Sequence, residues 1–228
     1  MTGDPGAQSA AVIEERAALL LTLRQGGVCD LSVLRAMEAT PREDFAPYRF
    51  RDLANRNLSL PIGCGQTMSR PLELARRLEA LRTGRGHRVL EVGAGSGYGA
   101  AALAHLAREV VTLERFETLA IEASRRLSAH GAANARAVHA DGLDPPRELG
   151  RFDRIIVQAS VGAAPAALIQ LLAPGGVMLF ARREHAMAGA RAKERLIKLD
   201  CNEEGELRET DLGPCRLGPA IPGLAQAL

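Results

Sequence analysis

The stretch VLEVGAGSGYG, residues 89–99, decides the fold. It begins within a short apolar run, RVLEVG at residues 88–93, and it leads into an Ala/Leu-rich run at residues 98–108. Three glycines, Gly93, Gly95 and Gly97, lie between the two runs. Glycine at such a turn allows a tight bend and lets the backbone approach a ligand closely. The stretch therefore predicts a strand, a ligand-binding turn and a helix in succession.

The alternation of strand and helix continues toward the C-terminus. We predict strands at 109–115, 135–140, 152–160 and 176–182, and helices at 116–130 and 166–174. Short apolar strands that alternate with helices predict an α/β fold, with a doubly wound, mostly parallel sheet covered on both faces. The last part of the chain reads as two strands around the turn NEEGE at residues 202–206. We expect these to be antiparallel strands at the C-terminal edge of the sheet.

The N-terminal part has a helical pattern instead. Helices are predicted at residues 12–25, which stop at Gly26-Gly27, and at residues 31–39, which Asp30 can cap. Pro71 then occupies the first turn of a third helix, residues 71–82. We expect residues 1–58 to be an N-terminal helical extension of a main domain at 59–228, within a single compact unit.

Composition and charge exclude several classes of protein. The 228 residues include 29 Lys and Arg against 27 Asp and Glu, a near balance that argues against a general nucleic-acid binder. The densest basic run, at residues 181–195, is typical of a solvated loop or strand edge. Neither a membrane span nor a secretory signal is evident, so we expect no membrane partner and a cytoplasmic location. The four cysteines and five histidines are scattered, which predicts no metal site.

The glycine turn and the next two strand ends indicate the cofactor. The dinucleotide fingerprint requires glycine where this chain has Tyr98, which disfavours a nicotinamide dehydrogenase. Glu114 follows the next strand, where a carboxylate can accept hydrogen bonds from both ribose hydroxyls of an adenosine. Asp141 and Gly142 follow the third strand, where they could meet the adenine ring. Because these groups share the carboxyl edge of the sheet, we predict a site for S-adenosylmethionine.

A second loop, SLPIGCGQTMSRP at residues 59–71, carries glycines and small hydroxyl side chains between two prolines. Together with VLEVGAGSGYGAA, VTLER, FDRIIVQAS and the upstream ATPREDF, it resembles the protein-L-isoaspartate (D-aspartate) O-methyltransferases. The resemblance covers about residues 34–182. It implies a Rossmann-like methyltransferase domain at 59–228. It also implies repair of damaged proteins or peptides, through methylation of the α-carboxylate of their isoaspartyl residues.

The resemblance also implies roles for individual residues. Ser69 is the expected active-site serine, which positions the acceptor by hydrogen bonding. The expected cofactor-binding residues are Glu91, Gly93, Ala94, Gly95, Gly97, Glu114, Arg115, Asp141 and Gly142. The expected acceptor-binding residues are Ile62, Gly65, Gln66, Thr67, Met68 and Gln158.

Departures from the family pattern keep two alternatives open. Ala140 and Leu143 flank the Asp-Gly pair, Gln158 replaces a threonine, and GPCRLGPAIPG at residues 213–223 differs from the usual substrate-binding segment. One alternative is a paralogue that methylates another carboxylate or small acceptor. The other is a catalytically weak adaptor that binds the cofactor and uses the basic run at 181–195 to hold a partner.

Overall fold

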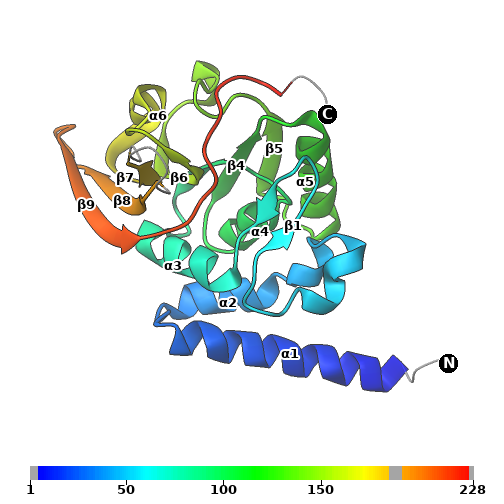
Figure 1. Ribbon diagram of the computed structural model, residues 1–228. Helices are drawn as coiled ribbons and strands as arrows, with labels where there is room; N and C mark the ends of the chain where they lie inside the picture. The colour runs from blue at the N-terminus through cyan, green and yellow to red at the C-terminus, as the bar shows by residue number, and fades with distance from the viewer. Residues whose placement is uncertain (1–4, 185–191, 226–228) are drawn as a thin grey trace.

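The computed structural model describes residues 5–184 and 192–225, so part of the basic run at 181–195 lies outside the described residues. Its centre is a seven-stranded sheet (Figure 1). The strand order is β5-β4-β3-β6-β7-β8-β9. The strands span Ala135–His139 (β5), Glu109–Glu114 (β4), Arg88–Val92 (β3), Phe152–Val161 (β6), Leu172–Arg183 (β7), Glu194–Cys201 (β8) and Leu207–Pro214 (β9).

The first five strands in this order run parallel to one another. Strand β8 runs antiparallel to both of its neighbours, β7 and β9. The prediction of antiparallel C-terminal edge strands around residues 202–206 is thus confirmed. Asn202 holds the turn between β8 and β9, because its side-chain oxygen accepts a hydrogen bond from the backbone N–H of Glu206 at 2.7 Å. The doubly wound α/β class is confirmed as well.

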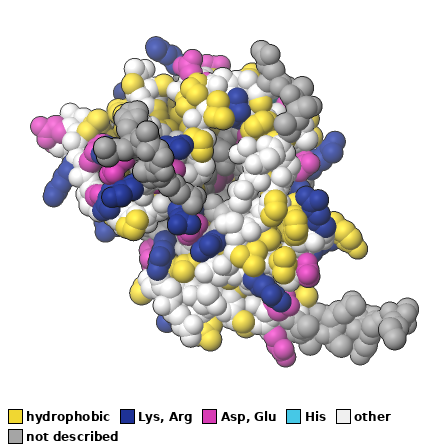
Figure 2. All heavy atoms as spheres, viewed as in Figure 1, with side chains coloured by type: hydrophobic (Ala, Val, Ile, Leu, Met, Phe, Trp, Pro, Cys, Tyr) yellow, Lys and Arg dark blue, Asp and Glu magenta, His cyan; other side chains and the backbone are white. Residues whose placement is uncertain are grey.

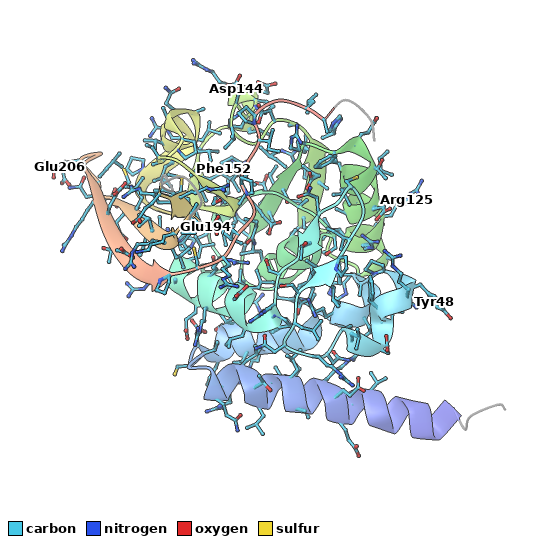
Figure 3. All side chains as sticks on the ribbon, in the orientation of Figure 1. Tyr48, Arg125, Asp144, Phe152, Glu194 and Glu206 are labelled. Carbon is cyan, nitrogen blue, oxygen red and sulfur yellow. The ribbon has the colours of Figure 1, made fainter. Side chains whose placement is uncertain are left out.

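Alternation of side chains along the strands builds a core on each face of the sheet. Val89 on β3 and Val110 on β4 belong to one buried cluster, whereas their neighbours Leu90 and Val111 belong to the other. The first cluster contains residues of α3 (Pro71–Leu81) and α4 (Tyr98–Ala104), together with Leu127 of α5 (Glu117–Ala129). The second contains residues of α6 (Ala166–Leu171) and Phe152, which Figure 3 labels.

The N-terminal elements contribute side chains to the first cluster. They are α1 (Pro5–Gln25), α2 (Leu31–Ala39) and the short 3-10 helices η1 (Arg42–Asp44) and η2 (Tyr48–Leu53). Asp30 caps α2 as predicted, since its carboxylate accepts hydrogen bonds from the backbone N–H groups of Ser32 and Val33. Leu23 and Phe45 are fully buried in the cluster that also contains Leu78 of α3. The division of the chain at residue 58 stays a prediction.

Two predicted helices are shorter than expected. The helix predicted at 98–108 ends at Ala104, because the side chain of Asn134 donates hydrogen bonds to the carbonyls of Ala104 and Ala107. The helix predicted at 166–174 ends at Leu171, and β7 begins at Leu172. Pro174 disfavours helical backbone in the residue before it, which explains the early stop.

The loop at residues 59–71 contains a small hairpin that the sequence analysis did not anticipate. Strands β1 (Leu60–Pro61) and β2 (Thr67–Met68) pair antiparallel. Cys64 and Gly65, at the centre of the connecting turn, both have positive φ, 59° and 64°. Two successive positive φ values characterise the type I′ turn, whose twist matches that of a hairpin. The turn therefore gives the loop a defined shape.

Among the described residues, none of the helices is both long and apolar enough to cross a membrane. The four cysteines are free thiols.

Candidate functional site

A cavity of about 1030 Å³ opens at the carboxyl ends of β3, β4 and β6. Further segments add to its wall: the hairpin loop, α3, residues 141–143 after β5, the ends of β7 and β8, and the C-terminal strap, by which we mean residues 215–225. In Figure 1 the strap (red) leaves β9 and crosses in front of the sheet toward the side of α5. The cavity thus lies at the edge of the sheet that the sequence predicts for a ligand.

Nearly all of the predicted site residues line this cavity. Those that do are Ile62, Gly65, Gln66, Thr67, Met68, Ser69, Glu91, Gly93, Ala94, Gly95, Glu114, Arg115, Asp141, Gly142 and Gln158. Gly97 is the exception. It has a φ of 87°, and a Cβ at this position would lie 3.2 Å from Cα of Ala123. Its lack of a side chain allows α4 to begin close to α5, so Gly97 shapes the turn without facing the cavity.

The glycine turn is held to the next strand by Glu114. One carboxylate oxygen accepts a hydrogen bond from the backbone N–H of Gly95 at 2.9 Å, and the other accepts one from Phe116 at 3.1 Å. Each carboxylate oxygen has a second lone pair, so Glu114 can still accept hydrogen bonds from a ligand in the cavity. The side chain of Phe116 and that of Leu143 add apolar wall to the same cavity.

Asp141 connects the third strand end to the C-terminal strap. Its carboxylate accepts hydrogen bonds from the backbone N–H groups of Leu143, at 2.9 Å, and of Gly223, at 2.6 Å. Arg115 holds the same part of the strap, because its Nε donates to the carbonyl of Gly223 at 2.9 Å. Asp141 and Arg115 therefore fix the strap over the cavity as well as lining it.

The other end of the strap is anchored at β6 and β8. Glu194, labelled in Figure 3, accepts hydrogen bonds from Oγ of Ser160 and from the backbone N–H of Leu217, both at 2.8 Å. Ser160 also exchanges backbone hydrogen bonds with Gly218 and Ala220. Sequence reasoning missed Glu194, because a lone acid at the start of a strand carries no signal of this role.

Glu91 lies on β3 with 1% of its surface exposed. Its carboxylate accepts hydrogen bonds from Oγ1 of Thr112 at 2.7 Å and from Nε2 of Gln158 at 2.9 Å. Burial raises the pKa of Glu91 to about 7, although both hydrogen bonds and the nearby Arg77 act in the opposite direction. Gln158, which departs from the family pattern in the sequence, thus bonds to a buried carboxylate.

The hairpin loop and the glycine turn lie close together. A Cβ at Gly95 would lie 3.3 Å from Cδ1 of Ile62, closer than carbon atoms usually approach, so a side chain at position 95 would crowd Ile62. Gly95 has a φ of 53°, a conformation that glycine adopts without steric cost. The two glycine-rich loops, far apart in the sequence, therefore form facing walls of one cavity.

Two buried arginines that sequence reasoning missed hold Ser69. Arg42 donates to the carbonyl of Ser69 at 2.9 Å and also bonds to those of Ala54 and Leu58. Burial lowers the pKa of Arg42 to about 10. Arg77, on α3, donates from Nη2 to Oγ of Ser69 at 3.1 Å and lines the cavity.

A signal for Arg77 was present in the sequence. The buried face of α3 includes Leu74, Leu78 and Leu81, and Arg77 lies on that same face. A charged residue on an apolar helix face is rarely buried without a specific partner, so it marks a candidate site. No such pattern marks Arg42.

Within the described residues, no group of three or more His, Cys, Asp and Glu side chains is arranged to hold a metal ion.

Figure 2 shows Lys and Arg side chains gathered on the side of the molecule where α3, β8 and β9 lie. Arg195 there pairs with Asp211, and Arg182 pairs with Glu209.

Comparisons with known proteins agree on one family. The family model described as "Protein-L-isoaspartate(D-aspartate) O-methyltransferase (PCMT)" matches residues 14–217. Protein-L-isoaspartate O-methyltransferase 2 of Rhodopseudomonas palustris is 41% identical over 220 residues, which cover 96% of this chain and 99% of the relative. The protein-L-isoaspartate O-methyltransferase of Rhodospirillum centenum is 42% identical over 208 residues, 91% of each chain.

Solved structures agree on the fold. A Plasmodium falciparum structure described as a putative protein-L-isoaspartate O-methyltransferase in complex with S-adenosyl-L-homocysteine is 22% identical. It has a TM-score of 0.76 and covers 90% of this chain and 98% of its own. A second protein-L-isoaspartate O-methyltransferase is 25% identical, with a TM-score of 0.77, over 92% of this chain and 67% of its own. The chain belongs to the protein-L-isoaspartate (D-aspartate) O-methyltransferase family.

Proposed function

We propose that the cavity transfers a methyl group from S-adenosylmethionine to the α-carboxylate of isoaspartyl residues in damaged proteins or peptides. The chain is a methyltransferase of this family, and S-adenosylmethionine is its cofactor. The assignment of the walls follows from their chemistry. The ends of β3, β4 and β5 bind the adenosyl part of the cofactor, and the hairpin loop binds the acceptor.

The first wall fits an adenosyl group. Glu114 offers carboxylate lone pairs to two ribose hydroxyls, and its backbone hydrogen bonds to Gly95 and Phe116 keep it in place. Phe116 and Leu143 provide apolar surface for a flat ring beside Gly142. When bound, the cofactor supplies an electrophilic methyl group on a sulfonium sulfur.

The second wall fits an acceptor carboxylate. Ser69 accepts a hydrogen bond from Arg77, which leaves its hydroxyl proton available to donate to an acceptor oxygen. An acceptor carboxylate is ionised at neutral pH, so its attack on the methyl carbon requires no general base. The new bond joins the carboxylate oxygen to carbon, and the electron pair of the broken bond returns to sulfur. Ser69 and the loop contribute position and water exclusion.

One observation carries the proposal: Ile62 of the hairpin loop and Gly95 of the glycine turn lie close together in the wall of one cavity. Methyl transfer requires donor and acceptor to approach within about 3–3.5 Å in line. Two walls that line one cavity and approach each other at Ile62 and Gly95 can bring them that close.

Methyl transfer to a synthetic isoaspartyl peptide, compared with its aspartyl twin, tests the proposal. The purified chain and radiolabelled S-adenosylmethionine are expected to produce a base-labile methyl ester on the isoaspartyl peptide alone. Calorimetry with S-adenosylhomocysteine should show binding in parallel.

Each negative result in this test would lead to a different conclusion about the protein. Binding without methylation of either peptide would favour a cofactor-binding adaptor, and methylation of another carboxylate would favour a paralogue with a different acceptor. An absence of binding would contradict the cofactor assignment itself. The cytoplasmic location and the lack of nucleic-acid or membrane partners stay predictions.

A further inference from the structure

The guanidinium of Arg77 is a buried cation on the acceptor side of the cavity. The residue is 3% exposed, and it lines the cavity together with Ser69. A guanidinium carries five N–H donors, and among the described residues Arg77 uses them for one hydrogen bond, to Oγ of Ser69. Within that part of the chain, its buried Nε has no hydrogen-bond partner.

In the part of the chain that the structure describes, no carboxylate forms an ion pair with Arg77. Glu73, one turn earlier on α3, and Glu91, on β3, attract it electrostatically. A buried charge without an ion-pair partner is costly, because removing it from water carries a large desolvation penalty. Burial accordingly lowers the pKa of the Arg77 guanidinium.

Acidic and basic side chains both line the cavity. The carboxylates of Glu73, Glu91, Glu114 and Asp141 lie in its wall, and Arg77 is the buried one among the basic side chains there. The other basic lining residues are exposed or half-buried, namely Arg115, Arg183, Lys193, Arg195 and Arg216. A charge paired away from water interacts more strongly than one at the surface, so Arg77 is the cation best placed to compensate an acceptor carboxylate. Arg115 is engaged elsewhere, since it bonds to the strap and lies over the ring of Phe116. Of the two buried arginines that bond to Ser69, Arg77 is the one that lines the cavity and donates to the hydroxyl oxygen.

We propose that Arg77 binds the acceptor carboxylate together with Ser69 and thereby makes the cavity selective for anionic acceptors. This inference rests on the proposed function of the cavity. The guanidinium takes one oxygen of the acceptor carboxylate, and the other oxygen stays free to attack the methyl carbon. A guanidinium has several N–H donors in one plane, so it can hold Oγ of Ser69 and one acceptor oxygen at the same time.

Three variants test the role of Arg77. Arg77→Met removes the charge at similar size, and Arg77→Lys keeps the charge but loses the planar set of donors. Arg76→Met is the matched control, because Arg76 lies on the same helix but donates to the carbonyl of Gly26, outside the cavity. For each variant we would measure KM and kcat with the isoaspartyl peptide, the Kd of S-adenosylhomocysteine, and the melting temperature. We would also measure inhibition by acetate in competition with the peptide.

Arg77→Met is expected to raise KM for the peptide about ten- to hundredfold, the usual cost of losing a charged hydrogen bond. The inhibition constant of acetate should rise in parallel, while the Kd of S-adenosylhomocysteine should stay that of the wild type. Arg77→Lys should recover part of both losses, and Arg76→Met should change neither.

Two results would overturn the inference. The first is an unchanged KM and unchanged acetate inhibition in Arg77→Met. The second is a weaker Kd for S-adenosylhomocysteine together with a lower melting temperature, which would assign Arg77 to the cofactor or to compensation of Glu91. If Arg77→Met does not fold, the acetate competition of Arg77→Lys decides between these outcomes. An inactive wild-type chain would instead contradict the proposed function.

Discussion

Glu91 shows at the scale of one residue how the site couples to pH. Burial raises its pKa in the folded protein to about 7, against 4.5 for an ordinary glutamate. Between these values the folded chain holds a proton on Glu91 that the unfolded chain has released. The contribution of Glu91 to stability is therefore fully present below about pH 4.5 and is lost as the pH rises toward 7.

Glu91→Gln is expected to remove this pH dependence. Because an amide side chain does not ionise, the variant should gain free energy of unfolding relative to the wild type by about 2–3 kcal/mol between pH 5 and pH 8. The amide of Gln158, whose Oε1 has no partner among the described residues, can turn to accept the new N–H donor. Urea unfolding at several pH values measures the difference. Glu148→Gln, at an exposed position, is the control for loss of one carboxyl group.

A difference between wild type and Glu91→Gln that stays constant from pH 5 to pH 8 would show that Glu91 ionises normally in the folded protein.

In helix α4, helix propensity and side-chain packing favour different residues at one position. Gly99 is the second residue of the helix, where alanine would ordinarily be favoured by about 1 kcal/mol. A Cβ at this position would overlap Oε1 of Glu91 and approach Nε2 of Gln158 to 3.2 Å. The glycine therefore leaves room for the buried hydrogen-bond network.

Gly99→Ala is expected to lower the free energy of unfolding by about 1–2 kcal/mol, because overpacking in a rigid core outweighs the gain in helix propensity. Chemical denaturation measures the change. Gly86→Ala is the matched control, since a Cβ there would meet nothing within 4 Å. A Gly99→Ala variant more stable than the wild type would mean that Glu91 moves aside freely.

The elements that could be predicted from the sequence are those that a local sequence pattern determines. The strand, turn and helix around Gly93 and Gly95 follow from glycine placement and apolar runs. Tertiary contacts decided the rest. The type I′ turn at Cys64 uses a residue uncommon at positive φ, and Asn134 ends α4 from a distant loop. Arg42 binds carbonyls of residues far along the chain, and no periodicity marks such a partner.

At the scale of the whole molecule, the cavity is closed by parts of the chain that lie far apart in sequence. The strap reaches back from β9 to bond with Glu194, Ser160, Asp141 and Arg115. In the sequence, most of this region was notable only because residues 213–223 differ from the substrate-binding segment that is usual in the family. Its place over the carboxyl edge of the sheet depends on those four anchors.

A chain that ends at Pro214 is expected to bind S-adenosylhomocysteine at least about tenfold more weakly, a loss of roughly 1.4 kcal/mol, because one wall of the cavity is removed. Calorimetry measures the change, and a thermal melt without ligand reports whether the fold persists. A chain that ends at Ala225 keeps the strap and serves as the control. Equal affinities for the two truncated chains would show that the strap contributes nothing to the cofactor site.

We expect donor and acceptor to meet in one cavity between the hairpin loop and the glycine turn. A crystal structure with S-adenosylhomocysteine and an isoaspartyl peptide would show whether they do. The sulfur should lie next to Gly93 and Gly95, and the peptide α-carboxylate on the same side, in contact with Ser69. A peptide carboxylate bound elsewhere on the surface, with protein atoms between it and the sulfur, would show that the two do not meet there.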